Sequence, residues 1–212
     1  MWNGKYTGLA VAVVLAGVLA SCSESGKGSG SGSSDNGEAA LSVAGIKKMA
    51  ADPGDTCPVS YDMAAALKAV GVKEPVKEGK VEGETADKDD PRAPLTLFRG
   101  ALVGCAYGVG KEKARVFTVG TGKGTAVNTL LPQVQHDSQM DLDAVQRYGE
   151  RARKAPRGKP LLTSTGNVAS IRLPVEGKGD IGLILAFGEG GTALTKAQVT
   201  DLTKELAAQA HA

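Results

Sequence analysis

Two pairs of apolar segments along the chain predict two antiparallel β-hairpins. The first pair is residues 101–107 and 114–119, and the second pair is residues 167–173 and 180–187. Each pair consists of strand-like apolar runs separated by a short polar turn that contains glycine, which is typical of hairpins. Residues 161–164 predict one further strand just before the second hairpin.

Other segments have apolar residues at the spacing of amphipathic helices. One helix is expected to begin at residues 56–57 and to end at Gly71, because glycine commonly follows the last turn. Another is expected to begin at residues 137–138, with acidic residues early and cationic residues late, as the helix dipole favours. Pro132 is expected to stop any helix that follows strand 114–119 after barely two turns.

The last helix has the clearest start. Thr195 and Gln198 are spaced as a capping box, in which each side chain accepts a hydrogen bond from a backbone N–H of the other residue. Val199, Leu202 and Leu206 then fall on one face and predict a buried stripe.

The remaining segments are less regular. Residues 73–92 predict a long exposed loop or an irregular edge strand, and residues 95–98 predict a strand. The stretch from Gly100 has the same order of strand, turn, strand and glycine-rich exit as the stretch from Gly166, at an offset of 66 residues (166 − 100). We therefore expect an α+β fold with an antiparallel sheet packed by helices, two related helix-plus-hairpin halves and a C-terminal helix.

The chain begins with a pattern that predicts export. Residues 9–20 form an apolar run, shorter than the roughly 20 residues of a membrane helix and within the roughly 7 to 15 of a secretory signal peptide. The run ends in Leu19-Ala20-Ser21-Cys22, which resembles the lipobox of bacterial lipoproteins. The resemblance implies cleavage before Cys22, a diacylglyceryl group and palmitate-like acyl chains at Cys22, and anchoring at the extracytoplasmic face of the cell membrane.

The segment after Cys22 predicts a flexible tether. Residues 23–39 contain Gly and Ser with no large apolar side chain, so nothing there offsets the entropy of ordering. A tether of this kind spans about 20 to 25 Å on average. We expect a lipoprotein signal peptide at residues 1–21, a tether at 22–40 and a single α+β domain at 41–212.

Charge and composition argue against a nucleic-acid partner. Without the leader the chain has 24 Lys and Arg (25 less Lys5) against 23 Asp and Glu, and only 4% of its residues are aromatic. Nucleic-acid binders usually have a basic excess or exposed aromatic rings. The basic residues within 147–159 are expected to be a solvated helix end, and contact with an anionic lipid or polymer is the alternative.

Two cysteines remain once Cys22 is assigned to the anchor. An even pair outside the cytosol most simply forms a disulfide, so we expect Cys57 to be bonded to Cys105. A reactive cysteine, the alternative, would need a nearby base. The chain has only His136 and His211, and neither lies in a recognisable catalytic pattern.

The sequence VGTGKGT at residues 119–125 has the composition of a phosphate-binding loop without its spacing. A P-loop needs a glycine five positions before the second glycine, and here Phe117 lies five positions before Gly122. In the related second half, Glu189 takes the place of Gly122. We therefore expect a glycine-rich strand exit, and no nucleotide or other cofactor.

The histidine and aspartates of residues 136–143 are the candidates for a metal cluster, and the serines are candidates for a catalytic nucleophile. His136 and Asp137 with Asp141 and Asp143 match no standard metal site, and an acidic helix start explains the carboxylates better. No serine has a partner histidine in a recognisable context. We expect no catalytic or metal-binding residues.

Several features together resemble a family of small actinobacterial cell-envelope lipoproteins whose function is not known. These are the lipobox, the tether, Asp52-Pro53 shortly before Cys57, the strand Gly104-Cys105-Ala106-Tyr107 and the final capped helix. The resemblance covers residues 52–210 and implies an α+β domain similar in shape to PsbP-like proteins.

The expected function is that of a non-enzymatic binding or accessory module of the cell envelope, with an envelope protein as its partner. One alternative is a carrier of a lipid or another small apolar ligand, which a large apolar cavity would favour. The other is an extracytoplasmic hydrolase, which a convergent cluster around His136 would favour.

Overall fold

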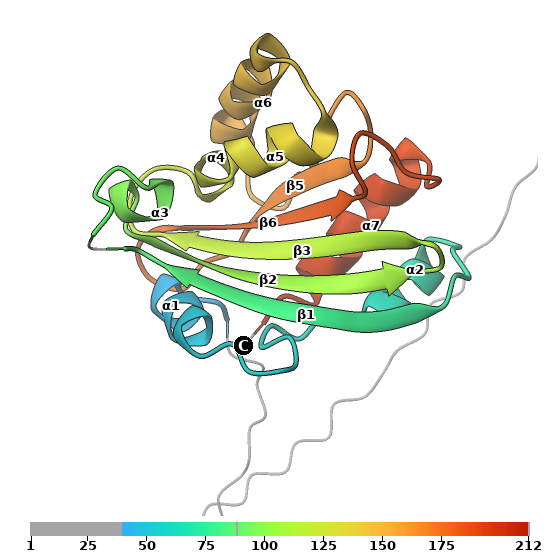
Figure 1. Ribbon diagram of the computed structural model, residues 1–212, viewed down its shortest axis with the longest axis horizontal. Coiled ribbons are helices and arrows are strands. Elements are labelled where there is room, and N and C mark those ends of the chain that lie inside the picture. Colours follow the sequence, from blue (N-terminus) through green and yellow to red (C-terminus); the bar gives the residue numbers. More distant parts are fainter. Residues whose placement is uncertain (1–39, 88, 212) are drawn as a thin grey trace, which may run out of the picture. The chain divides into compact units, whose positions relative to one another are not determined.

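The chain folds around one antiparallel β-sheet (Figure 1). The computed structural model describes residues 40–87 and 89–211. The sheet has six strands in the order β1-β2-β3-β6-β5-β4, and the predicted α+β class is confirmed. The strands are β1 (Val76–Thr85), β2 (Gly100–Val109), β3 (Glu112–Thr121), β4 (Leu161–Leu162), β5 (Val168–Leu173) and β6 (Asp180–Phe187).

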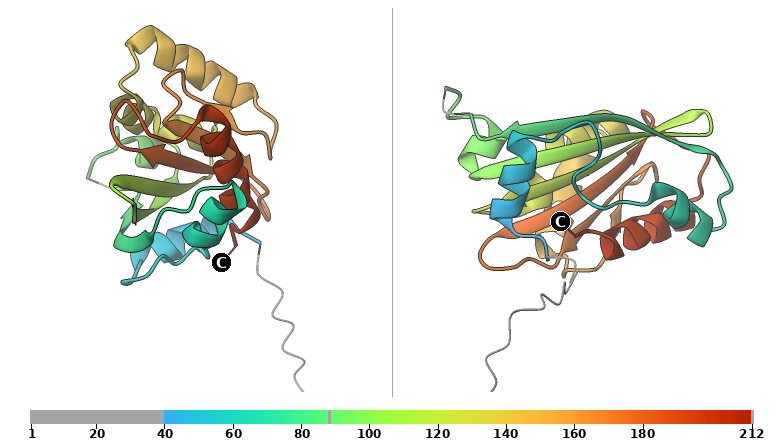
Figure 2. Two further views of the ribbon diagram at one scale, coloured as in Figure 1. Left: turned by 90° about the vertical axis from the view of Figure 1, so that its right-hand side faces the viewer. Right: turned by 90° about the horizontal axis from the view of Figure 1, so that it is seen from below.

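Helices cover the two faces of the sheet unequally (Figures 1 and 2). One face, here called the α7 face, packs against α1, α2 and α7, and the other, the α6 face, packs against α4, α5 and α6. The short α3 lies before β2 at the edge of the sheet. The helices are α1 (Val43–Ala51), α2 (Met63–Ala69), α3 (Pro94–Leu97), α4 (Ala126–Thr129), α5 (Leu131–Ser138), α6 (Leu142–Lys154) and α7 (Lys196–Ala208).

The larger core lies between the α7 face and its helices. Alternate residues of a strand point to one face, so the apolar residues of β2, β3, β5 and β6 that meet here are spaced by two. The predicted stripe Val199, Leu202 and Leu206 of α7 is fully buried against them. The predicted capping box is also present, because Gln198 N–H donates to Thr195 Oγ1 at 3.2 Å and Thr195 N–H donates to Gln198 Oε1 at 2.9 Å.

The α6 face has a smaller core built around Tyr148 of α6. Tyr148 is fully buried, and its hydroxyl lies 2.6 Å from Ser170 Oγ and donates to the carbonyl of Leu161 at 3.1 Å. Burial raises the pKa of Tyr148 well above that of free tyrosine. α6 therefore covers β5 and β6, and the Tyr148 ring that it buries there is uncharged and hydrogen-bonded.

Both predicted hairpins are present and lie side by side. β2 pairs with β3, β5 pairs with β6, and β3 pairs with β6 to join them. β6 is buried along its whole length, because helices cover it on both faces. The relation between the two halves that their sequences suggest stays a prediction.

The segment predicted as a loop or an edge strand is the edge strand. β1 runs for 10 residues along β2, and its register shifts between Glu78 and Val81. Most of its side chains are exposed and charged. Charges and bulges of this kind keep an edge strand from pairing with other chains.

One strand prediction and two helix predictions need correction. Residues 95–98, predicted as a strand, lie mainly in α3, which begins with Pro94 and buries Leu95 beside Val119 and Ala126. The helix predicted from residues 56–57 begins at Met63, because the preceding segment is bound to β2 and crosses the sheet.

The region around Pro132 contains two helices rather than one. α4 ends at Thr129, as the proline predicts, but Pro132 then occupies the first turn of α5, where its missing N–H costs nothing. Residues 137–138, predicted to start a helix, end α5 instead, and Asp141 caps the start of α6.

Candidate binding groove

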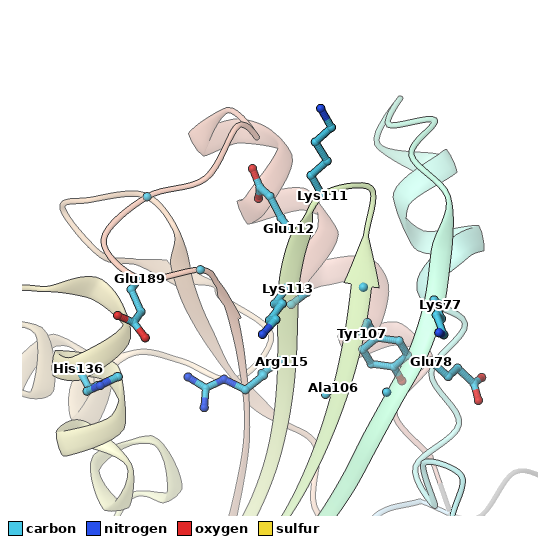
Figure 3. Close-up of a pocket in the computed structure, with 15 residues that line it drawn as sticks. Lys77, Glu78, Ala106, Tyr107, Lys111, Glu112, Lys113, Arg115, His136 and Glu189 are labelled. Carbon is cyan, nitrogen blue, oxygen red and sulfur yellow. The ribbon is translucent and has the colours of Figure 1, made fainter.

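The α6 face is open over β1 and β2, and a groove of about 990 Å³ lies there (Figure 3). α4, α5 and α6 pack on β3, β5 and β6 and leave the neighbouring strands uncovered. The floor of the groove is formed by Gly79, Ala106 and Gly108. These residues have little or no side chain, so the surface of the sheet is hollowed over β2 and the adjoining part of β1.

The strand register places cations on both sides of this floor. Gly108 of β2 is paired with Lys77 of β1 and with Lys113 of β3, and Ala106 is paired with Arg115 of β3. Residues directly opposite each other in antiparallel strands share a face of the sheet. Since neighbouring strands are about 4.8 Å apart, the backbones of Lys77 and Lys113 are separated by about 10 Å.

Arg115 is held in place by a buried carboxylate. It donates a hydrogen bond to Asp137, whose side chain is 1% exposed. Asp137 Oδ1 also accepts from Gln133 Nε2 at 2.9 Å and lies 3.2 Å from His136 Nδ1. The side chain of Arg115 is still 40% exposed. Because a guanidinium has five N–H donors, Asp137 fixes its position and leaves other donors available to the groove.

One wall of the groove is made by the end of α5 and the loop after β6. The fully buried Asn167 donates from Nδ2 to the carbonyl of Asp137 and to the carbonyl that ends β6, both at 2.8 Å. Gly190 N–H donates to the same Asp137 carbonyl at 2.7 Å. These bonds fix His136 and Glu189 on one side of the groove, with Arg115 reaching toward them (Figure 3).

One acidic residue near the groove is hydrogen-bonded to groups outside it, and the carboxylate of a second points away from the groove. Glu112 accepts hydrogen bonds from the hydroxyl and a backbone N–H of residues 192–193, at 2.6 and 2.7 Å. Glu78 is paired with Tyr107, whose ring is buried on the α7 face, and its carboxylate points away from the other labelled groups in Figure 3. Glu189 is the acidic residue that remains on the wall.

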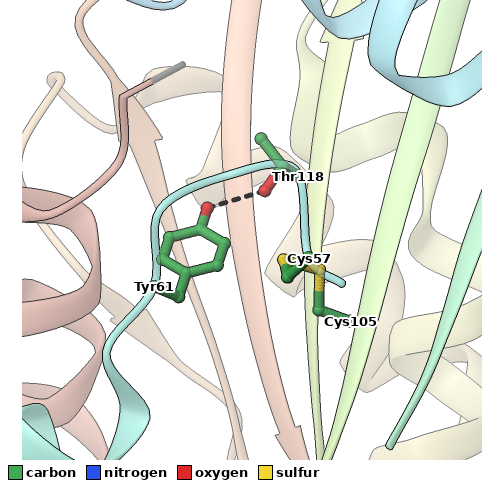
Figure 4. The surroundings of a disulfide bond; sticks show 4 residues. All are labelled: Cys57, Tyr61, Cys105 and Thr118. Atoms are coloured by element: carbon green, nitrogen blue, oxygen red, sulfur yellow. Dashed lines mark hydrogen bonds between the residues drawn. A yellow bond between two sulfur atoms is a disulfide. The ribbon is translucent and has the colours of Figure 1, made fainter. Parts of the chain in front are cut away.

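The predicted disulfide is present on the opposite face of the same strand (Figure 4). Cys57 is bonded to Cys105 of β2, with a Cα–Cα distance of 5.6 Å. Close by, the buried Tyr61 hydroxyl lies 2.6 Å from Thr118 Oγ1, and burial raises the pKa of Tyr61. The segment before α2 is thus fixed across β2 and β3, directly behind the groove floor.

The predicted lipid attachment at Cys22 lies outside the described residues, as do the leader and almost all of the tether. Those assignments stay predictions. No helix within residues 40–87 and 89–211 is long and apolar enough to cross a membrane.

The glycine-rich exit after β3 binds a carboxylate of the chain itself. Asp180 Oδ2 accepts a hydrogen bond from Ala126 N–H, the first residue of α4, at 2.9 Å. Arg172 donates to both oxygens of Asp180 at 2.8 to 3.2 Å, and Arg157 is 3.5 Å away. The start of α4, directly after this loop, is therefore bonded to the ion cluster of Asp180 and Arg172, which joins β5 and β6.

The residues considered as a metal cluster do not all lie together: His136 contacts Asp137, whereas Asp141 has a different role. Asp141 caps α6 by accepting from Ala144 N–H at 2.6 Å, whereas Asp137 is paired with Arg115. In the described part of the chain, no group of three or more His, Cys, Asp or Glu side chains could hold a metal ion. The basic stretch is a helix end as expected, with Arg151 stacked 5.9 Å from the centroid of the Tyr148 ring.

The groove is the feature that sequence reasoning missed. Its one local signal is the alternation in β2, where Gly104, Ala106 and Gly108 point to one face and larger apolar residues point to the other. That pattern marks a face with little side-chain volume. It does not show that helices leave the face uncovered.

No family model, no curated protein and no solved structure matches this chain.

Proposed function

We propose that this chain is an exported lipoprotein, anchored through Cys22 at the extracytoplasmic face of the membrane, and that it acts as a non-enzymatic binding module of the cell envelope. The observation that supports binding is the open groove over β1 and β2. One of its charged groups, Arg115, is held by the buried Asp137 before any ligand arrives, which lowers the cost of ordering that side chain on binding.

The disulfide and the N-terminal pattern support the location. Disulfides persist in oxidising compartments and are rare in the cytosol. The lipobox-like residues before Cys22 and the glycine-rich segment after it suit a domain that is held near a membrane by lipid. The resemblance to actinobacterial envelope lipoproteins points to the same location.

The arrangement of charges favours binding over hydrolysis. Asp137 is neutralised by Arg115, so its carboxylate serves to position the guanidinium. The lining residues of the groove, taken from the described part of the chain, include no serine, threonine or cysteine, so none of these could form a covalent intermediate with a substrate there.

Photo-crosslinking in cells of the native host tests the proposed binding surface. A photoreactive amino acid replaces Lys113, which is exposed at the groove, and in a second strain it replaces Gln146, which is exposed on α6. We expect an adduct from position 113 that position 146 does not give. Equal adducts from both positions, or none from position 113, would contradict a binding role for the groove. A protein adduct identifies an envelope partner, whereas a lipid adduct supports the carrier alternative.

A further inference from the structure

The free charges of the groove are mainly positive. Lys77 and Lys113 border the floor, and neither side chain forms a hydrogen bond or an ion pair with another described residue. Arg115 shares its charge with Asp137 but is still 40% exposed. Glu189 opposes these cations from the wall. A ligand that enters the groove therefore meets a surface that favours negative charge.

The floor between these cations is apolar and has room for a slender group. Gly108 does not adopt a left-handed backbone conformation, and a Cβ at this position would come no closer than 3.8 Å to another atom, Lys77 Cβ. A side chain could therefore be built there without strain. Its absence leaves space between Lys77 and Lys113, about the width of one extended chain.

The cations and the floor together define the ligand. We propose that the groove binds a small amphiphilic anion, in which a carboxylate or phosphate contacts Lys77, Lys113 and Arg115 and an apolar chain lies over Gly79, Ala106 and Gly108. This inference rests on the proposed binding function and specifies its ligand class.

A titration with three probes tests this ligand class. The full chain with Cys22→Ala is used, because it is unlipidated and needs no detergent. The probes are decyl phosphate, decyltrimethylammonium and inorganic phosphate, each kept at concentrations at which it is monomeric, and heat is measured by isothermal titration calorimetry. We expect decyl phosphate to bind about tenfold more tightly than either of the others, a difference of about 1.4 kcal/mol. Equal binding of the two decyl probes, or of the two phosphates, would overturn the proposal.

Two substitutions at the edge of the groove are expected to change the affinity for decyl phosphate in opposite directions. Lys113→Glu should weaken decyl phosphate binding about tenfold, because it replaces an attraction with a repulsion. Glu189→Gln should strengthen it about twofold to fivefold, because it removes a repulsion. A gain in affinity cannot come from a damaged fold. Unchanged affinity in both variants would contradict the assignment. Arg115 is not substituted, since that would leave Asp137 buried and unpaired.

A pair of glycine substitutions tests the floor. Gly108→Val should fill the floor and weaken decyl phosphate binding about tenfold. Gly122→Val is the matched control, because Gly122 is exposed, has a nearest neighbour at 3.6 Å and lies about 30 Å along β3 from Lys113. The control should bind as the parent does. Equal losses in both variants would show that the floor is not the contact surface.

Vesicles separate a free ligand from a membrane headgroup. Binding of the parent and of Lys113→Glu to phosphatidylglycerol vesicles is compared with their binding of decyl phosphate. If Lys113→Glu weakens vesicle binding as strongly, the groove contacts the bilayer surface, and the small-ligand proposal is wrong. If titrations fail while the crosslink from position 113 in cells persists, only the ligand class is wrong and the binding function stands.

Discussion

Removing the Cys57–Cys105 disulfide is expected to lower the free energy of unfolding by about 4 kcal/mol, which is the chain-entropy estimate for a loop of this length. The bond holds the segment before α2 against β2, where Val59 and Tyr61 are buried. Cys57→Ala combined with Cys105→Ala removes it without adding a polar group to the core. Urea unfolding followed by circular dichroism measures the change.

Two comparisons separate the crosslink from the packing of the sulfur atoms. Dithiothreitol should destabilise the parent nearly as much as the double substitution does, and should leave the double variant unchanged. A difference below about 1 kcal/mol between oxidised and reduced parent would mean that the sheet and helices hold this segment without the bond.

Asp180→Ala is expected to destabilise the chain by about 3 to 5 kcal/mol, the usual cost of removing one member of a buried ion pair. The Asp180 side chain is 4% exposed and neutralises Arg172, which is itself only 22% exposed. It also accepts from Ala126 N–H, so the first turn of α4 would lose its partner. Urea unfolding gives the change in free energy.

Asp201→Ala is the matched control for this prediction. Asp201 forms an ion pair with Lys204 at 2.7 Å, but both side chains are about half exposed. Exposed pairs contribute between about 0 and 1 kcal/mol, so this variant should unfold close to the parent. Similar losses of unfolding free energy in the two variants would show that the ion cluster at Asp180 contributes no more to stability than an exposed ion pair. Adding Arg172→Met to Asp180→Ala should recover part of the loss, because it removes the unpaired buried charge.

The parts of the fold that local sequence decides were predictable. A hairpin brings together segments that are close in the chain, and the two hairpins were found from their apolar runs and glycine-containing turns. The start of α7 was found because Thr195 and Gln198 form a cap within one turn. The disulfide was predicted by counting the cysteines of a chain that is expected to be exported.

The errors lie where tertiary contacts override local pattern. Residues 95–98 have strand-like composition, yet Pro94 starts a helical turn that buries Leu95. Pro132 predicts the end of a helix, but proline is equally suited to the first turn of the next helix, α5, where the structure places it. At residues 56–57, the disulfide holds the chain across the sheet and delays the helix to Met63.

The groove was beyond the reach of local pattern because five separate segments build it. Lys77, Gly108 and Lys113 share one row only through the register of three strands. His136 and Glu189 join them only because Asn167 ties the end of α5 to the loop after β6. The alternation in β2 marks its small-residue face, but the uncovered state of that face depends on where α4, α5 and α6 pack.

The positions of the groove and of the first described residues are compatible with a tethered binding module. α1, the first helix, packs on the α7 face, whereas the groove lies on the α6 face. A chain held by lipid at its N-terminal end would therefore have its groove on the opposite face of the sheet from the point where the domain begins.

The central claim, export as a lipoprotein, is tested most directly by intact-mass and peptide analysis of the protein purified from membranes of its native host. We predict an N-terminus at Cys22 with the added mass of a diacylglyceryl group, together with a peptide in which Cys57 is bonded to Cys105. A chain that retains residues 1–21, lacks acyl mass at Cys22 and has free thiols at the other two cysteines would contradict the account.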